Sequence, residues 1–401
     1  MTSNNAPMST WDMYRSLMLS VYLPSFFMSL CQGSVLLIIP LFALELDASV
    51  GIAALVFSLR GLGNMVVDVP AGFAASRFGD KYTMLLGVAV MAITGLMASQ
   101  ATTAPGLAAF AFLFGSAMAT WLIARLTHIS EVVPAYHRGK AISAMAGLQR
   151  FGNLIGPIVS GFVAVQYGFE YVFVGVSVLA VIAFCMVVIY VPENKKGHHE
   201  DSPNITRLVP HILGSHYKIF LTAGVAVLFL TVLRAGRQLL IPLWGESLGL
   251  DAAEIGLIMG CAAAIDMTLF PVAGYIMDNL GRRYAAIACL TLLSLGIFLV
   301  PFSFGFTTLL LAAMLVGFGN GFGSGINMTL GADFAPPNER GEFLGVWRLM
   351  GDSGSFLGPI LMGYIASTFV LATAFTVTSL LGVVGIFMMS FFVKETLVKK
   401  S

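Results

Sequence analysis

Nine charged side chains stand inside long apolar stretches of this chain. If those stretches cross a membrane, each charge costs about 2.5 to 3.5 kcal/mol at the bilayer centre, and it persists only when it is paired or faces water. Such groups are candidates for binding a solute, moving a proton or locking two parts of the protein together. Six are basic and three are acidic: Arg60, Arg125, Arg150, Arg234, Arg237 and Arg348, with Asp68, Asp266 and Asp352.

Two of the arginines, Arg234 and Arg237, are three residues apart and therefore share one face of a helix, with Gln238 beside them. Guanidinium groups bind carboxylate or phosphate through two parallel hydrogen bonds, which offsets the cost of burying the charge. This spacing favours a ligand that carries an anionic group.

The composition indicates an integral membrane protein. Hydrophobic residues make up 58% of the chain and charged residues only 10%, and the mean hydropathy is +0.89. That leaves too little polar surface to cover a soluble apolar core. Since a helical span needs about 20 apolar residues, the sequence predicts an all-α fold with twelve spans. They cover residues 17–44, 51–75, 83–100, 106–130, 141–166, 170–191, 219–245, 252–277, 284–303, 307–331, 343–368 and 371–393.

The positions of the remaining charges predict the orientation in the membrane. Outside the spans, lysine and arginine occur only near the two ends of the chain and in alternate connections. The opposite connections hold only acids, such as Glu45, Asp47 and Glu246. By the positive-inside rule, both termini are predicted to be cytoplasmic. The short connections favour the inner membrane of a bacterium.

The chain is predicted to have two halves, because it resembles itself after a shift of 202 positions. A charged linker, residues 192–217, separates an N-terminal bundle of six spans, residues 1–191, from a C-terminal bundle, residues 218–401. Where the two copies differ, function is expected. Positions that recur in register include Gly79 and Gly281, Lys81 and Arg283, and Gly156 and Gly358.

Two motifs at the ends of spans 2 and 8 carry a family resemblance. They read Gly72-Phe-Ala-Ala-Ser76-Arg77-Phe-Gly79-Asp80-Lys81 and Gly274-Tyr-Ile-Met-Asp278-Asn-Leu-Gly281-Arg282-Arg283. Both resemble the loop signature of the major facilitator superfamily, which occurs once in each half. The resemblance covers essentially the whole chain and implies two pseudo-symmetric six-helix bundles that move a solute by alternating access. It also implies a cytoplasmic latch between the halves, in which Asp278 is retained and Ser76 replaces the usual acid.

A motif in span 5 points to the antiporter branch of that superfamily, which includes drug and metabolite exporters. The motif contains Gly152, Gly156 and Pro157, and span 11 has a copy with Gly358 and Pro359. Such spacing predicts a kinked, close-packed seam. Two other features of the branch are missing, since Ala111 replaces an arginine in span 4 and Gln32 stands where many exporters have an acid in span 1. Proton-coupled export is therefore expected on the span 5 motif alone.

The resemblance also predicts which buried charges meet. In this fold span 5 faces span 8 and span 2 faces span 11, and counting residues along the helices gives matching depths. Asp352 stands opposite Arg150 in the repeat, and Arg60 is its expected partner. These pairs would act as gates that open when the halves rock, and static cross-links are the alternative. The two pairs predicted between the halves are Arg150 with Asp266 and Asp68 with Arg348.

The remaining arginines would lie on the spans that surround the central cavity in this fold. Their excess of positive charge favours an organic anion, although Arg125 and Glu131 could instead form a structural cluster. The expected proton carriers are Asp68, Asp266 and His128, and simple packing is the alternative for His128. The expected solute contacts are Arg125, Arg234, Arg237, Gln238 and Gln32.

Together these features predict a secondary transporter for a small amphipathic or anionic solute. Proton-coupled export leads; an organic-anion uptake symporter or uniporter is the alternative, and a transporter-like receptor is less favoured because no signalling segment accompanies the spans. An enzyme is not expected, since no nucleophile, base and orienting group stand at recognisable spacing. The four cysteines lie in spans without paired spacing. We expect no metal, cofactor or nucleic-acid partner, and a monomer in the lipid bilayer.

Overall fold

The computed structural model describes residues 10–193, 205–337 and 339–397, and helices are the regular secondary structure of these ranges. The N-terminal helices are α1 (Thr10–Leu17), α2 (Leu23–Glu45), α3 (Val50–Phe78), α4 (Asp80–Ala98), α5 (Ala104–Val132), α6 (Ala135–Tyr167) and α7 (Phe169–Tyr190). The C-terminal helices are α8 (Ile205–Ser215), α9 (Tyr217–Ile219), α10 (Val225–Ser247), α11 (Ala252–Asn279), α12 (Arg282–Leu299), α13 (Phe306–Phe322), α14 (Ile326–Phe334), α15 (Arg340–Thr368) and α16 (Leu371–Phe391). Short π-helical turns, η1 (Met18–Tyr22) and η2 (Phe220–Gly224), precede α2 and α10, and a 3-10 turn, η3 (Val300–Phe302), follows α12.

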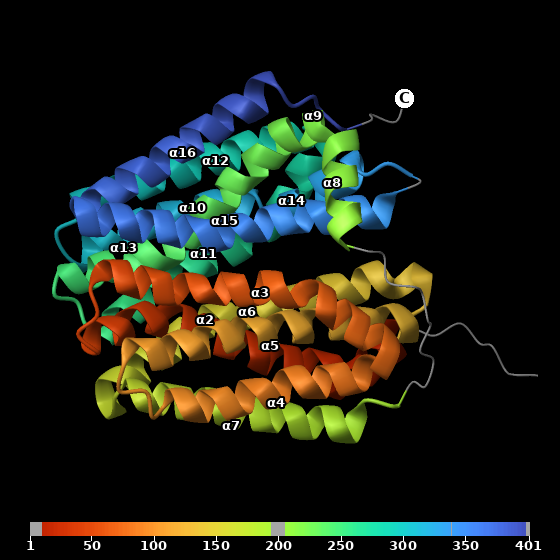
Figure 1. The fold of residues 1–401 in the computed structure, drawn as a ribbon, viewed down its shortest axis with the longest axis horizontal. Helices are drawn as coiled ribbons and strands as arrows, with labels where there is room; N and C mark the ends of the chain where they lie inside the picture. Colours follow the sequence, from red (N-terminus) through yellow and green to blue (C-terminus); the bar gives the residue numbers. More distant parts are fainter. Residues whose placement is uncertain (1–9, 194–204, 338, 398–401) are drawn as a thin grey trace, which may run out of the picture.

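The helices form two stacked bundles (Figure 1), with α1–α7 in one and the later helices in the other. Each predicted span overlaps described helices, with the tenth span divided between α13 and α14, and ten helical stretches are long and apolar enough to cross a membrane. The other two long helices are α6 and α15, which carry Arg150 and Arg348. They pack against α11 and α3 of the opposite half, so much of their surface faces protein instead of lipid. Helix α8 belongs to the predicted linker, of which residues 194–204 lie outside the described ranges.

The sequence repeat reappears in the packing of the two bundles. Each half places a glycine where a Cβ atom would collide with the backbone of a neighbouring helix. Gly115 faces the carbonyl of Arg60, and Gly317 faces the carbonyl of Ala262. The two glycines and the two partners are each 202 positions apart, as are the starts of η1 and η2. The two bundles therefore share one set of close contacts.

The two ends of the molecule differ in charge. The connections α2–α3, α6–α7 and α10–α11 lie at the left of Figure 1, and we call this the acidic end. The connections α3–α4, α5–α6 and α11–α12 lie at the right with α8, and we call this the basic end. The acidic end carries Glu45, Asp47, Glu170, Glu246 and Asp251, and the basic end carries Arg77, Lys81, Arg138, Arg282 and Arg283.

At the acidic end the two halves are in backbone contact. A Cβ atom on Gly161 of α6 would collide with the carbonyl of Ala252 in α11, and one on Gly256 of α11 would collide with the carbonyl of Pro157. Helices α3 and α15 are also close at this end, where a Cβ atom on Gly363 would collide with the Cβ atom of Ala54. Nearer the basic end of these helices, several glycines have open space where a Cβ atom would stand: Gly72, Gly147, Gly274 and Gly345. The tightest contact between the halves is therefore at the acidic end.

The motif glycines divide into packing and turn positions. Gly152 and Gly156 of α6 pack closely against α2, next to Pro157 in the same helix. Gly358 of α15 packs against Val232 of α10, next to Pro359.

Gly72 and Gly274, the first glycines of the two loop motifs, have no atom within 4 Å of a Cβ position. They are therefore not closely packed against another helix in this conformation. The tight turns are instead made by Gly79 and Gly281, whose φ angles of +88° and +128° suit glycine alone.

The contact that closes the acidic end has no room for a side chain at position 161. We expect Gly161→Val to wedge α6 away from α11, because its new side chain would meet the backbone at Ala252. Spin labels at Tyr167 and Glu246, in a cysteine-free background, should report a longer distance across this end. Gly147→Val on the same helix is the matched control and should leave the distance unchanged. An unchanged distance in Gly161→Val would contradict the conclusion that the contact between α6 and α11 closes this end.

Candidate functional site

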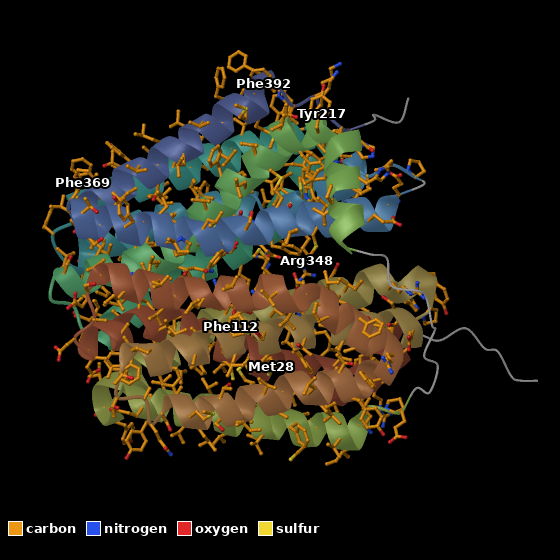
Figure 2. All side chains as sticks on the ribbon, in the orientation of Figure 1. Met28, Phe112, Tyr217, Arg348, Phe369 and Phe392 are labelled. Carbon is orange, nitrogen blue, oxygen red and sulfur yellow. The ribbon has the colours of Figure 1, made fainter. Side chains whose placement is uncertain are left out.

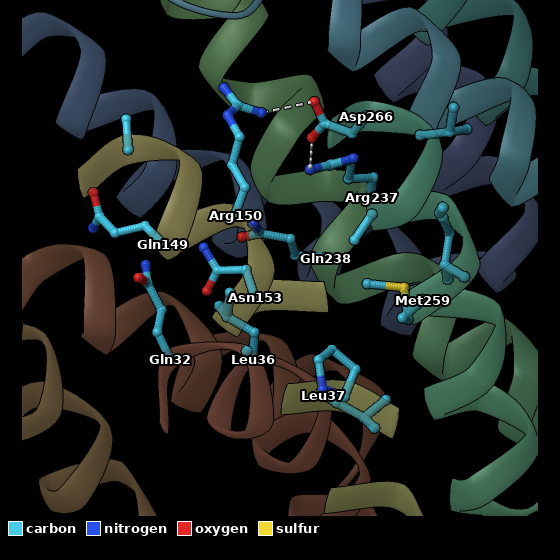
Figure 3. Close-up of a pocket in the computed structure, with 17 residues that line it drawn as sticks. Gln32, Leu36, Leu37, Gln149, Arg150, Asn153, Arg237, Gln238, Met259 and Asp266 are labelled. Atoms are coloured by element: carbon cyan, nitrogen blue, oxygen red, sulfur yellow. Dashed lines mark hydrogen bonds and ion pairs between the residues drawn. The ribbon is translucent and has the colours of Figure 1, made fainter. Parts of the chain in front are cut away.

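A cavity of about 400 Å³ lies between the halves, with walls from α2, α6, α10, α11 and α13. Its size suits a small organic molecule. Figure 3 shows amide side chains on one side of it, and Arg150, Arg237 and Asp266 together on another. The apolar wall includes Leu36, Leu37 and Met259. The polar lining residues are Gln32, Gln149, Arg150, Asn153, Arg237, Gln238 and Asp266.

Asp266 is the centre of the charge network in this cavity. Arg150 Nη1 donates to its Oδ1 at 3.0 Å from the opposite half, and Arg237 Nη2 lies 3.6 Å from its Oδ2. Asn320 Nδ2 donates to the same Oδ2 at 2.5 Å, and Ser324 Oγ lies 3.5 Å from Oδ1. The predicted pair of Arg150 and Asp266 is therefore present. With two guanidinium groups and one carboxylate, the lining has a surplus of one positive charge.

A second network joins the halves between α3 and α15. Arg348 Nη2 donates to Asp68 Oδ1 at 2.8 Å, and Arg348 Nε lies 3.5 Å from Asp352 Oδ2. Figure 2 places Arg348 at the seam between the bundles. This predicted pair is also present. Arg60 lies over the ring of Phe57 at 5.2 Å, and among the described residues the ion-pair partner of Asp352 is Arg348 instead of the expected Arg60.

The repeat was altered at both networks. Arg150 corresponds to Asp352, and Asp266 corresponds to Asn64, so the inter-half ion pair of one seam is replaced by an aspartate and an amide at the other. The guanidinium of Arg150 also stacks over Phe270 at 4.7 Å, at the position that corresponds to Asp68. The cavity is therefore electrostatically asymmetric although its scaffold is symmetric.

Comparison with known families agrees with this architecture. The family model described as Major Facilitator Superfamily matches residues 21–236 and 231–401. The chain belongs to the major facilitator superfamily. It is therefore a transporter, not an enzyme. An uncharacterised MFS-type transporter of Methanocaldococcus jannaschii is 21% identical over 367 residues, which is 91% of this chain and 95% of that protein.

Other relatives show partial or structural likeness. The quinolone resistance protein NorA of Staphylococcus aureus is 27% identical over 140 residues, which is 35% of this chain and 36% of NorA. A D-xylose-proton symporter superposes with a TM-score of 0.73 at 16% identity, covering 96% of this chain and 98% of that one. A bacterial homologue of the human lysosomal transporter Spinster has a TM-score of 0.78 at 14% identity, covering 96% and 98%. The structural likenesses show the fold.

Two of the arginines expected to bind solute do not line the cavity of this transporter. The cavity contains Gln32, Arg237 and Gln238 from the expected set. Arg125 is 1% exposed inside the N-terminal bundle. Arg234 is engaged by span 10, where Nε donates to Asn320 Oδ1 at 2.9 Å and Nη2 donates to Gly323 O at 2.7 Å. Arg234 lies on α10, which borders the cavity, but its side chain bonds to span 10 instead. Arg125 lies on α5, which contributes no residue to the cavity wall.

His128 has a partner that the sequence did not reveal. Its Nδ1 contacts Asp80 Oδ2, and both side chains are 1% exposed. Asp80 occupies the position of Arg282 in the repeat, and Arg282 Nε lies 3.2 Å from Asp333 Oδ2. The two halves therefore place opposite charges at equivalent positions, and this inversion was the available signal. His128 does not reach the cavity, so a direct proton path from it to the solute is not visible here.

The latch residues of the MFS signature are apart in this conformation. Asp278 is 75% exposed and pairs only with Arg282, one turn along, at 3.7 Å. Ser76 donates to Phe73 O within its own helix at 2.9 Å. The backbone amides of Arg282 and Arg283 donate instead to Glu395, which caps the start of α12. The contacts that the described residues of this motif make thus remain within the C-terminal half.

Sequence reasoning missed four polar residues of the site: Gln149, Asn153, Asn320 and Ser324. Gln149 and Asn153 flank Arg150 on the same helix face, so their spacing was a usable signal. Asn320 and Ser324 lie among the closely spaced glycines of span 10.

A further polar contact fixes the linker helix at the basic end. Nε2 of His216 and Nε2 of His211 lie 3.3 Å and 3.4 Å from the two carboxylate oxygens of Glu339. These hydrogen bonds, with His216 as the larger contributor, lower the pKa of Glu339 below its usual value of 4.5. The contact connects α8 to the segment that precedes α15.

Neutralising one partner of the α3–α15 pair should weaken the closed acidic end. We expect Asp68→Asn to increase maleimide labelling of a cysteine placed at Ala54, which is buried against Gly363 at this end, about fivefold, at the low end of typical coupling energies. The charge swap of Asp68→Arg with Arg348→Asp should restore slow labelling. Ser353→Ala removes only a hydrogen bond within α15, to the carbonyl of Met350, and serves as the control. Equal labelling rates in Asp68→Asn and the parent would contradict a conformational role.

The Glu339 contact should depend on pH in a defined direction. Because the native pKa is lowered, the ionised form stabilises docking of α8 above pH 4.5, and this contribution is lost as the pH falls through the native value. Spin labels at Leu213 and Leu349 should therefore separate on acidification below 4.5. In Glu339→Gln the distance between the labels should be the same above and below pH 4.5. A pH-dependent distance in this variant would assign the change to another group.

Proposed function

We propose that this protein is a proton-coupled secondary transporter of a small organic anion, which binds at Arg150 and Arg237. The observation that carries the proposal is the convergence of these two guanidinium groups, one from each half, on the single carboxylate of Asp266. An anionic solute can replace that carboxylate as their partner. The amides of Gln32, Gln149 and Asn153 would bind its polar groups.

Competition for the arginines supplies a reason for proton coupling. When the anion binds Arg150 and Arg237, Asp266 loses its cationic partners, and a buried carboxylate without them favours the protonated form. Proton and anion binding then strengthen each other, as linkage requires. Two ligands that bind together cross together, so this arrangement favours symport and hence uptake driven by an inward proton gradient.

Export is the second candidate. It is favoured by the span 5 motif and by the partial similarity to NorA, described as a quinolone resistance protein. In export by antiport, proton and solute must exclude each other from the cavity. The sign of the linkage between them therefore separates the two candidates.

The proposed orientation places the basic end in the cytoplasm of a bacterial cell, with both termini on that side. The glycine seam closes the opposite end, so this conformation would take up or release solute on the cytoplasmic side. Opening the seam requires the halves to rock, and the inter-half pairs of Arg150 with Asp266 and Asp68 with Arg348 would break and reform as gates. A monomer is sufficient, because both gates lie within one chain.

Transport by purified protein in liposomes tests the proposal. Organic anions and cationic drugs are supplied with and without an imposed pH gradient, and uptake is followed with labelled solutes. We expect anion movement that is accelerated by a proton gradient in the same direction. Arg237→Gln should raise the KM for the anion about tenfold, the loss of one charge-assisted contact, whereas Arg340→Gln at the exposed start of α15 is the control. Movement of cations alone would overturn the anion assignment, and acceleration by the opposite gradient would select export.

A further inference from the structure

Span 10 is broken close to the cavity acid. Helix α13 ends at Phe322 and α14 begins at Ile326, and Gly325 between them has a φ of +82°, in the region that favours glycine. A helix end leaves backbone carbonyls without their usual partners. The carbonyl of Gly323 accepts hydrogen bonds from Ile326 N at 3.1 Å and from Arg234 Nη2 at 2.7 Å. Arg234 thus supplies a donor to the backbone of the break.

Arg234 holds the break from two positions at once. Its Nε donates to Asn320 Oδ1 at 2.9 Å on the last turn of α13, while its Nη2 binds Gly323 in the turn that follows. The planar guanidinium has donors at fixed angles and can make both bonds together, which an ammonium group on a flexible stem does poorly. Since Arg234 makes both bonds and does not line the cavity, it is not available to the solute.

The same break is connected to Asp266. Asn320 donates to Asp266 Oδ2 at 2.5 Å from the last turn of α13, and Ser324, within the break, lies 3.5 Å from Oδ1. Asp266 is also faced by Arg150 and Arg237. Any change in the charge or partners of this carboxylate therefore alters the hydrogen bonds that set the geometry of the break.

Beyond the break, α14 carries contacts that organise the basic end. Trp347 Nε1 donates to Asn327 Oδ1 at 2.7 Å. Farther along, Asp333 lies 3.2 Å from Arg282 and accepts a hydrogen bond from Thr396 at 2.6 Å. A change of angle at the break would shift these contacts, because α14 is a rigid element of nine residues.

We propose that Arg234 is a positioning residue that couples the state of Asp266 to the angle between α13 and α14. It acts through Asn320 and the carbonyl of Gly323, and its effect reaches the Arg282–Asp333 contact at the basic end. The assignment rests on the proposed function only in treating Asp266 as the group that the solute releases. The coupling itself exists without solute and can be measured without it.

Cys289 of α12 is a native reporter of the break. It is fully buried, and its Sγ atom lies where a Cβ on Gly323 would stand, next to Arg234 Nη2. With Cys31, Cys185 and Cys261 replaced by alanine, it is the single thiol of the chain. Its alkylation by N-ethylmaleimide requires the break to open. The rate of alkylation therefore reports the free energy of opening.

The decisive experiment is a double-mutant cycle on this rate, in the absence of solute. We expect Asp266→Asn and Arg234→Met each to accelerate alkylation of Cys289 about tenfold, and the double variant to be no faster than either single variant, because both act through one connection. Arg234→Lys should be intermediate. Arg125→Met, which removes a buried arginine from the other bundle, should be as slow as the parent. Each variant is first checked for a monodisperse elution profile.

Three results would overturn the coupling. One is a parent-like rate in Arg234→Met, and another is a parent-like rate in Asp266→Asn. The third is a double variant about a hundredfold faster than the parent, which is the product expected for independent sites. If Arg234→Met does not fold, Arg234→Lys is combined with Asp266→Asn, and hydrogen exchange at residues 323–327 replaces alkylation. A failure of anion transport leaves these rates unaffected, so the two proposals are tested separately.

Discussion

A carboxylate buried between the two halves of a membrane protein must be matched by positive charge, and Asp266 is matched from both halves. Arg150 reaches it from α6, and Arg237 approaches it from α10. Removing either guanidinium would leave a buried charge poorly compensated, which costs more than the pair itself contributes. The cavity, the inter-half seam and the break in span 10 all meet at this one group. The rest of the site can be understood as the set of contacts that compete for it.

Duplication explains why this competition is possible. A symmetric transporter would have the same residues at equivalent positions in its two halves, and the glycine contacts of Gly115 with Arg60 and Gly317 with Ala262 show that the scaffold still does so. Charges, by contrast, were exchanged at equivalent positions, as in Asp80 and Arg282. Backbone contacts tolerate little change because they fix helix spacing. Side chains between the two halves were free to diverge, and their divergence gave the cavity its polarity.

Much of this arrangement could be predicted from the sequence, because depth along a helix follows from counting residues. Counting brought Arg150 to Asp266 and Asp68 to Arg348, and the structure has both pairs. The direction of a side chain around its helix does not follow in the same way. Arg234 and Arg237 share a helix face by their spacing. The small difference in their direction around the helix still places Arg237 in the cavity and Arg234 against span 10. The break at Gly323 was also hidden, since glycine repeats serve packing and flexing alike.

The closed acidic end and the charged centre have different capacities for change. Where Gly161 meets Ala252, the backbones already touch, so that seam can only be closed or open. The networks around Asp266 and Asp68 contain long arginine side chains that can exchange partners without leaving a charge unmatched. An ion pair that can be traded for a solute contact lowers the barrier between conformations, whereas a purely apolar seam would hold the halves regardless of what the cavity contains. The charges lie between the closed contact at the acidic end and the loosely packed glycines nearer the basic end. Their position therefore lets a solute in the cavity influence whether the acidic end is closed.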